Sequence, residues 1–207
     1  MERPTSEQIA ALPLYPALPP DRILVLRDAA QCEFAERELR LAGAVGFDTE
    51  SKPMFVAGGV PTGPHIVQFA TAQRAFIVHT ELPETEAFLR AMLESETLHK
   101  VGFGIASDKA PLHRKLGVKL AGGIDVSFMV RRLGFKQAVG LKTAVAIVLE
   151  QRMPKSKKVT TSNWAAPRLS PQQLQYAAND AHASLMVYRA LQATGFQSGR
   201  VDHAAQS

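Results

Sequence analysis

Cysteine is almost absent from this chain of 207 residues, and so are long apolar stretches. The single cysteine, Cys32, excludes an internal disulfide and favours a reducing compartment. The mean hydropathy is -0.05, and no apolar run is long enough for a membrane-spanning helix. The first eight residues, MERPTSEQ, contain no apolar core of the kind found in secretory signals. We therefore expect no membrane association and a cytoplasmic location.

Two common kinds of ligand site are also missing from the sequence. It contains no GxxxxGK segment, which excludes a P-loop for nucleotide phosphates. Its six histidines show no spacing typical of zinc ligands, and Cys32 has no second cysteine to pair with. Zinc chemistry is therefore a poor interpretation.

Positive charge exceeds negative charge by a modest margin. The chain has 24 Lys and Arg against 19 Asp and Glu, a net charge of +5 and a pI near 9.5. This balance suits a polyanionic partner, although many basic proteins never bind nucleic acid. Hydrophobic residues make up 46% and charged residues 21%, and the length suits one globular domain.

Apolar periodicity predicts a mixed α/β domain at 22–194, after a Pro-rich N-terminal segment (1–21) and before a C-terminal tail (195–207). Within the N-terminal segment, ALPLYPALPP (11–20) is expected to lie extended on the surface. Strands are predicted at 23–26, 44–50, 65–69, 75–78 and 100–103, and helices at 29–41, 84–93, 106–116, 141–150 and from 170 to 195. The short connections after 44–50 predict an antiparallel meander, and parallel β-α units follow it.

Two acids lie two positions apart on the strand at 44–50. Asp48 and Glu50 therefore project from one face, whereas Val45 and Phe47 point to the core. Like charges this close repel each other unless a cation lies between them or one carboxyl is protonated. The pair predicts either a site for a hard divalent ion or two acids at a solvated strand end.

The last helix brings a tyrosine and an aspartate onto one face. Ser170 suits its N-cap, Pro171 its first turn, and Gln173 can complete a capping box. Tyr176 and Asp180 then lie one turn apart among small apolar residues. A carboxylate in such surroundings needs a partner, which a metal ion could provide. Alternatively, Asp180 reaches solvent and Tyr176 packs in the core.

A further acid, Asp108, opens the helix that follows the strand at 100–103. Capping and the helix dipole alone favour Asp in a first turn. Asp108 therefore gains significance only from its order in the chain, after Asp48 and Glu50 and before Asp180.

These acids and their neighbours resemble the three motifs of the DEDD superfamily of 3′-5′ exonucleases, in the tyrosine-bearing branch that contains RNase D and Werner-type exonuclease domains. The resemblance covers roughly residues 22–192, and its ordered set of motifs is far more specific than any one of them. The histidine-bearing branch is disfavoured by Gln175, which occupies the position where that branch has His. The matching segments are VGFDTE (45–50), VGFGIASD (101–108), GLK (140–142), SNW (162–164) and LQYAAND (174–180).

The resemblance implies a ribonuclease H-like mixed sheet flanked by helices, and a two-metal 3′-5′ exonuclease that uses Mg²⁺ or Mn²⁺. Asp48, Glu50 and Asp180 would bind one ion. Asp48 would bridge to a second ion, whose waters Asp108 would anchor. Tyr176 would orient the attacking water. The substrate would be the single-stranded 3′ end of DNA or RNA, and the motifs do not choose between them.

Several residues near the motifs are candidates for contacts with the nucleic acid. Lysines of this kind would bind phosphates without sequence preference, but those at 155–158 are equally typical of a solvated loop. Ser51 and Lys52 stand where relatives often carry bulkier apolar residues near the terminal base. Trp164 is better suited to packing the last helix than to base stacking. The candidates are Thr49, Lys52, Lys142, Lys155, Lys157 and Lys158.

Two alternatives remain at this point. One is a non-catalytic nucleic-acid-binding module on the same fold, although such proteins usually lose an acid and none is lost here. The other is a dinucleotide-binding oxidoreductase, because Gly102-x-Gly104 and Asp125 resemble part of a Rossmann fingerprint. Ser107 occupies the place of its third glycine, however, and the carboxylates would then have no role.

Overall fold

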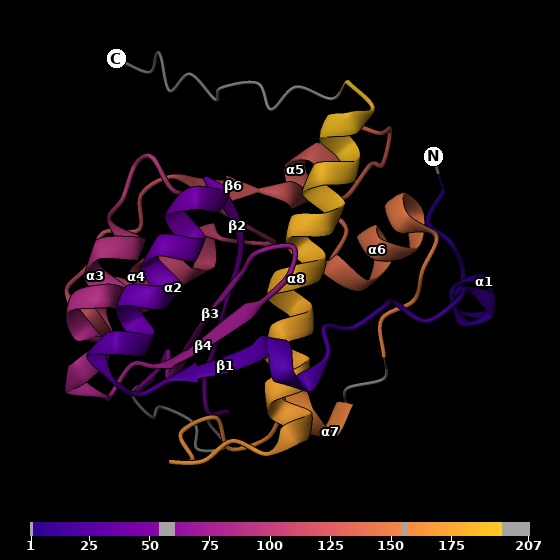
Figure 1. Ribbon diagram of the computed structural model, residues 1–207. Helices are drawn as coiled ribbons and strands as arrows, with labels where there is room; N and C mark the ends of the chain where they lie inside the picture. Colours follow the sequence, from indigo (N-terminus) through magenta and orange to yellow (C-terminus); the bar gives the residue numbers. More distant parts are fainter. Residues whose placement is uncertain (1, 54–60, 155–156, 196–207) are drawn as a thin grey trace.

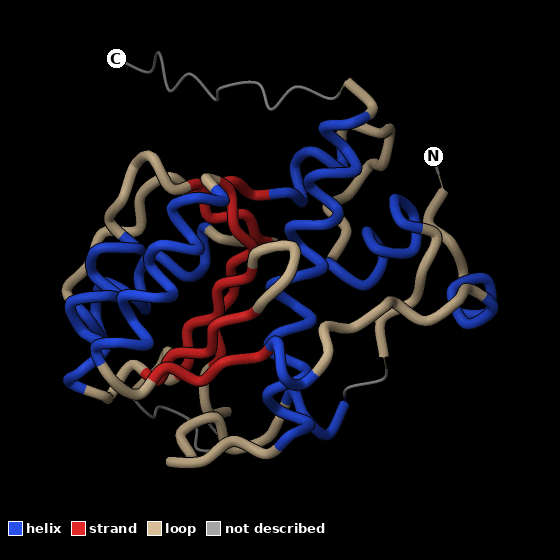
Figure 2. The backbone as a smooth tube through the Cα atoms, in the orientation of Figure 1, coloured by secondary structure: helices blue, strands red, loops and turns tan. Residues whose placement is uncertain are grey.

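The computed structural model describes residues 2–53, 61–154 and 157–195, and its centre is a six-stranded sheet (Figure 2). The strand order is β1-β4-β3-β2-β5-β6. The middle strands β2, β3 and β4 run antiparallel, whereas β1 is parallel to β4, and β5 and β6 continue parallel to β2. The predicted meander and mixed sheet are confirmed. The strands are β1 (Ile23–Leu26), β2 (Ala44–Glu50), β3 (Ile66–Ala70), β4 (Ala75–His79), β5 (His99–Gly102) and β6 (Gly123–Asp125).

Helices cover both faces of this sheet. Figure 1 shows α2, α3 and α4 on one face, and the long helix α8 crossing the other face beside α5 and α6. The described helices are α1 (Ser6–Ala11), α2 (Ala29–Ala42), α3 (Glu86–Leu93), α4 (Ala106–Leu116), α5 (Val126–Arg131), α6 (Leu141–Leu149), α7 (Lys157–Thr160) and α8 (Pro171–Ala193), with 3₁₀ turns at Pro20–Arg22 and Pro83–Thr85. No helix in the described ranges is long and apolar enough to cross a membrane.

Strand alternation assigns each residue of β2 to one of the two faces. Val45 and Phe47 are buried in the apolar core beneath α2, α3 and α4, as predicted. Asp48 and Glu50 point from the opposite face, which α8 covers. The carboxylates therefore lie between the sheet and its longest helix.

The start of α8 agrees with the sequence signal. The side chain of Ser170 accepts a hydrogen bond from the Gln173 backbone, and the Gln173 side chain accepts one from the Ser170 backbone. This capping box satisfies amide groups that otherwise have no helical partner. The buried face of α8 then has Ala177, Ala178 and Ala181, small residues that let the helix approach the sheet closely.

One close approach of α8 to the sheet occurs at Gly46 on β2. A Cβ atom added to Gly46 would collide with the backbone carbonyl of Ala181. Only glycine therefore permits this crossing, and the residue next to Ala181 on the helix is Asp180. The segment VGFDTE alone does not reveal this requirement, because it does not show which backbone lies against Gly46.

The N-terminal segment departs from expectation in two ways. The first is α1, which was not predicted even though Thr5 and Gln8 form a capping box at its start. The second concerns the Pro-rich stretch, which is extended but does not simply lie on the surface. Its Tyr15 and Leu18 are buried, Leu18 against alanines of α8.

Tyr15 ties this segment to α8 and to the chain after α6. Its hydroxyl lies 2.7 Å from Nδ1 of His182, and its backbone N–H donates to the carbonyl of Arg152. The guanidinium of Arg152 donates in turn to the carbonyl of Leu12. The Arg152 side chain thus helps to hold the N-terminal segment against the chain that follows α6. Of the predicted tail 195–207, all but Gly195 lies outside the described residues.

Candidate active site

Three of the predicted carboxyl groups meet where α8 crosses β2. Ligand oxygens of Asp48, Glu50 and Asp180 all lie within 4.8 Å of one another. Asp48 and Glu50 are half-buried, and Asp180 is only 8% exposed. Gly46 lies two positions before Asp48 on β2, and Ala181 directly follows Asp180 on α8, so the contact between Gly46 and Ala181 places the acids of the two elements near each other.

Burial raises the pKa of every member of this cluster, and repulsion between the carboxyls adds to the rise at Asp48 and Glu50. Burial, followed by the charges of Asp180 and Asp108, raises the pKa of Asp48 well above its ordinary range. Burial raises the pKa of Glu50 to about 9, and the charges of Asp48, Asp180 and Asp108 add to this rise, that of Asp48 most strongly. Burial raises the pKa of Asp180 to about 6, although a hydrogen bond from Tyr176 and the charge of Lys142 oppose the rise.

This donor set fits a hard divalent cation. The cluster offers only carboxylate oxygens, which suit Mg²⁺ and Mn²⁺ better than softer ions. Without a cation, the carboxyls relieve their repulsion by keeping protons near neutral pH. A cation that displaces those protons would stabilise the ionised cluster, so the residues present match what such an ion requires.

Asp108 lies at the margin of the cluster and does not belong to its group of three. It is half-buried in the first turn of α4, where the hydroxyl of Thr49 donates to its Oδ1 at 2.6 Å. Burial raises the pKa of Asp108, the Thr49 bond opposes this, and Asp125 adds to it. Because Thr49 lies between Asp48 and Glu50, this bond joins the second motif to the first. Thr49 was predicted only as a contact to nucleic acid.

Tyr176 lies against Asp180, as their spacing on α8 predicted. Its hydroxyl forms side-chain hydrogen bonds with Asp180 and Thr160. Burial and the charge of Asp180 raise the pKa of the phenol, which therefore remains protonated at neutral pH. Its ring packs against Trp164, with the ring centres 5.9 Å apart. Trp164 is completely buried, so it supports Tyr176 and is not exposed for base stacking.

A pocket of about 510 Å³ opens beside Tyr176 and Asp180. Lys142 from α6 and Lys158 from α7 line this pocket, and both are exposed. Lys52 is exposed as well, just after β2. Lys155 lies outside the described residues, as does the side chain of Lys157. The other residues that line the pocket are Met153, Pro154, Val159, Gln172, Gln175 and Asn179.

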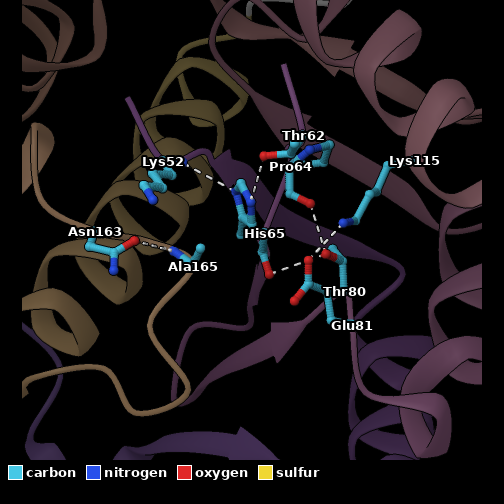
Figure 3. A network of polar contacts seen from close by, with 9 residues as sticks. All are labelled: Lys52, Thr62, Pro64, His65, Thr80, Glu81, Lys115, Asn163 and Ala165. Atoms are coloured by element: carbon cyan, nitrogen blue, oxygen red, sulfur yellow. Dashed lines mark hydrogen bonds and ion pairs between the residues drawn. The ribbon is translucent and has the colours of Figure 1, made fainter. Parts of the chain in front are cut away.

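The chain that follows Glu50 is fixed by a polar network around the buried His65 (Figure 3). The backbone N–H of Lys52 donates to Nδ1 of His65 at 3.2 Å, and the hydroxyl of Thr62 lies 3.2 Å from Nε2. The hydroxyl of Thr80 donates to the carbonyl of Pro64 at 2.7 Å. One imidazole thus anchors both limbs of the loop between β2 and β3, whose residues 54–60 lie outside the described part.

Sequence reasoning missed two residues at this site. His65 was set aside because it had no metal-ligand spacing, yet its role is to hold backbone next to Glu50. Gln68 was predicted only as part of a strand. A single amide side chain in the otherwise apolar segment IVQFA is unusual for a fully buried strand. That mismatch is the signal that could have identified Gln68.

The turn that resembled a dinucleotide fingerprint has a structural explanation. The backbone of Gly104 has φ +69°, and its N–H donates to Asp125 at 3.2 Å. Asp125 also caps α5 by accepting from the Ser127 backbone. A Cβ atom on Gly102 would crowd the carbonyl of Phe47. Asp125 and both glycines therefore shape the β5–α4 connection, in a mixed sheet and not a doubly wound parallel one.

Comparison with known proteins gives one consistent result. The family described as 3′-5′ exonuclease matches residues 24–195. A 3′-5′ exonuclease of Arabidopsis thaliana is 32% identical over 152 residues, which cover 71% of this chain and 52% of the plant protein. The mouse bifunctional 3′-5′ exonuclease/ATP-dependent helicase WRN is 27% identical over 178 residues, or 83% of this chain and 13% of WRN. The chain thus spans about half of the first relative and a small part of the second.

The fold has solved counterparts. Trypanosoma brucei RNase D, in a crystal structure with the RNA U12, superposes with a TM-score of 0.69 and 18% sequence identity. The match covers 95% of this chain and 66% of that protein. The ribonuclease H-like arrangement expected from the sequence is confirmed.

Proposed function

Because the chain belongs to the 3′-5′ exonuclease family, we propose that it is a divalent-metal-dependent exonuclease that shortens single-stranded DNA or RNA from the 3′ end. The observation that carries this proposal is the meeting of Asp48, Glu50 and Asp180 within 4.8 Å. The RNA in the complex of the structurally similar RNase D supports a nucleic-acid substrate. A reducing compartment, such as the cytoplasm, suits the single buried Cys32.

The chain's own residues would have distinct tasks in this reaction. Asp48, Glu50 and Asp180 would hold one ion, and Asp48 would also hold the second, whose waters Asp108 would anchor. Bound Mg²⁺ or Mn²⁺ would activate water and neutralise charge on the leaving oxygen. The carboxyls must lose their protons before they can bind these ions, which makes activity fall at low pH.

Tyr176 would position the attacking water and would not act as a base. Its pKa is raised, so the hydroxyl keeps its proton. It can therefore donate one hydrogen bond to Asp180 while its oxygen accepts another. This bifunctional hydroxyl is suited to fixing a water near the Asp180 carboxylate.

The substrate strand would approach through the pocket beside α6 and α7. Lys142 and Lys158 line its walls and would attract the phosphate backbone. Lys52 is also exposed, in the loop that follows Glu50. We include Thr49, Lys155 and Lys157 as further candidates from the sequence, although the Thr49 hydroxyl already binds Asp108.

The test uses the purified chain with 5′-end-labelled single-stranded DNA and RNA, in the presence of Mg²⁺, Mn²⁺ or a chelator. We expect a ladder that shortens from the 3′ end with either metal ion and no products with the chelator. Cleavage of a circular single strand would instead identify an endonuclease. Binding of the strands without any cleavage would favour the non-catalytic module.

Asp48→Ala is the first variant to make. Activity should fall to background because both ion sites lose a ligand. The melting temperature in chelator should not fall, since a half-buried carboxyl that its neighbours repel has been removed. Glu86→Ala, an exposed acid on the opposite face of the sheet, is the matched control and should retain full activity. An active Asp48→Ala protein would contradict the proposed site.

A further inference from the structure

The buried amide of Gln68 is a polar group beside this site that the proposed chemistry leaves without a role. Gln68 is completely buried on β3. Neither its nitrogen nor its oxygen has a hydrogen-bond partner among the described residues. Burying an unsatisfied amide costs about 1–3 kcal/mol, and an apolar side chain of similar size would avoid this cost. A group that destabilises the fold in this way needs a separate explanation.

The strand register places Gln68 directly opposite Asp48. The two residues are cross-strand partners in the antiparallel pair of β2 and β3. Directly opposed side chains in such a pair leave the same face of the sheet, with Cβ atoms about 4.5–5.5 Å apart. The Gln68 side chain therefore begins beside the Asp48 carboxyl and is long enough to reach it.

The neighbours of Gln68 show that it faces the site and not the opposite core. Ile66 and Ala70, two positions away on each side, pack with residues of α8. Val67 and Phe69 belong to the core beneath α2, α3 and α4. The Gln68 amide thus lies in the apolar layer between β3 and α8, where Asp48 and Asp180 supply the nearby charge.

Asp48 has a hydrogen-bonding position to spare. One of its oxygens, Oδ1, accepts the backbone N–H of Thr49 at 2.9 Å. A carboxylate has about four acceptor positions, and an amide NH₂ has two donors. A donor beside such a half-buried carboxylate restricts the rotation of the carboxylate.

We propose that Gln68 is a positioning residue: when the site binds cations, its amide donates to the Asp48 carboxylate and holds it in the orientation that binds them. The proposal rests on the proposed function, since it assigns Gln68 to the same metal site. Gln68 does not touch the reacting atoms and acts only through Asp48. Residues that orient metal ligands in this way typically change metal affinity or activity by roughly 10–100-fold when they are replaced.

The decisive variants are Gln68→Met and Gln68→Leu, which retain most of the side-chain volume and remove the donor. In chelator their melting temperatures should equal or exceed that of the unmodified protein, because an unsatisfied amide is gone. Their affinity for Mn²⁺, measured by titration calorimetry without nucleic acid, should fall roughly tenfold or more. The kcat for strand degradation should fall as well, with KM little changed.

Gln173→Met is the matched control. Gln173 is also a buried glutamine, but its amide nitrogen donates to the side chain of Ser162 and its oxygen completes the capping box. This variant should lose stability while its affinity for Mn²⁺ remains unchanged. The comparison separates the loss of a buried amide in general from the loss of this one.

Two negative outcomes have different meanings. If the unmodified protein binds Mn²⁺ and degrades strands, and both Gln68 variants match it in affinity and kcat, Gln68 has no positioning role. If the unmodified protein neither binds Mn²⁺ nor degrades strands, the proposed function itself fails. Two variants with different packing also keep the result from depending on one substitution.

Discussion

The hydroxyl of Tyr176 is the one group that phenylalanine would lack, and it forms hydrogen bonds with Asp180 and Thr160. Tyr176→Phe should lower kcat roughly 100-fold by removing the group that orients water, with little effect on KM. Steady-state degradation of end-labelled strands measures both constants. Tyr188→Phe is the control on the same helix, because the Tyr188 hydroxyl accepts from Gln192. Unchanged turnover in Tyr176→Phe would remove Tyr176 from the mechanism.

The bond from Thr49 to Asp108 has a consequence for pH dependence. Thr49→Val removes a donor that lowers the pKa of Asp108, so that pKa should rise. The ionised form of Asp108 is the one that would serve the second ion, and activity should therefore begin at a higher pH. A pH-activity profile between 5 and 9 measures this displacement. Thr85→Val, whose hydroxyl binds only backbone carbonyls in the described structure, should leave the profile in place.

At the scale of elements, the crossing of α8 over β2 decides whether a cluster exists at all. Gly46→Ala places a methyl group against the Ala181 carbonyl, and neither backbone can yield without moving Asp180 away from Asp48. We expect a loss of about 3 kcal/mol in the free energy of unfolding and a loss of activity. Denaturant unfolding and the strand assay measure the two effects.

Gly43→Ala provides the control for that experiment. Gly43 caps α2 with φ +67° and has open space around it, so alanine there meets backbone strain but no collision. The cost should be about 1 kcal/mol, and activity should remain. Full activity in Gly46→Ala would show that α8 can shift without separating the acids.

The sequence was most informative about elements whose signals are local. Alternation along β2 and the capping box at Ser170 each depend on a few adjacent residues, and both predictions were correct. The burial of Tyr15 was missed because its partner His182 is 167 positions away along the chain. The same limit applies to Gly46, since glycine on a strand does not reveal which backbone will lie against it.

The candidate site followed a similar rule. The resemblance supplied the acids and Tyr176 in their chain order, and the structure brings Asp48, Glu50 and Asp180 together. It could not supply Gln68, because the motifs do not specify the strand register between β2 and β3 that places Gln68 opposite Asp48. Asp108 was expected among the metal ligands, and its bond to Thr49 at the margin of the cluster is a structural finding.

For the whole molecule, the acid cluster makes stability depend on pH in a defined direction. The folded-state pKa values of Glu50 and Asp180 are raised to about 9 and about 6. These two carboxyls therefore bind more protons in the folded than in the unfolded protein above pH 4.5, so their contribution to stability is greatest at low pH and decreases as pH rises toward 9. In chelator, the change in melting temperature from pH 5.5 to pH 8 should be more negative for the unmodified protein than for Glu50→Gln, which lacks one of the two carboxyls.

Mn²⁺ should reverse this trend, because it binds the ionised carboxylates of the folded state. The melting temperature with Mn²⁺ should exceed that with chelator, and the difference should be larger at pH 8 than at pH 5.5. Differential scanning fluorimetry at both pH values tests this, with Asp48→Ala as a variant in which the difference shrinks. An equal effect of Mn²⁺ in that variant would place the bound ion elsewhere.

The packing of Tyr15 and Leu18 against α8 limits how far the chain can be shortened from its N-terminus. The segment matched by the exonuclease family begins at residue 24, and a fragment cut there would lack both side chains. The cut would expose alanines beside Asp180 and would remove the Tyr15 hydroxyl that contacts His182. Loss of activity after such trimming would reflect a loosened helix and would say nothing about the chemistry.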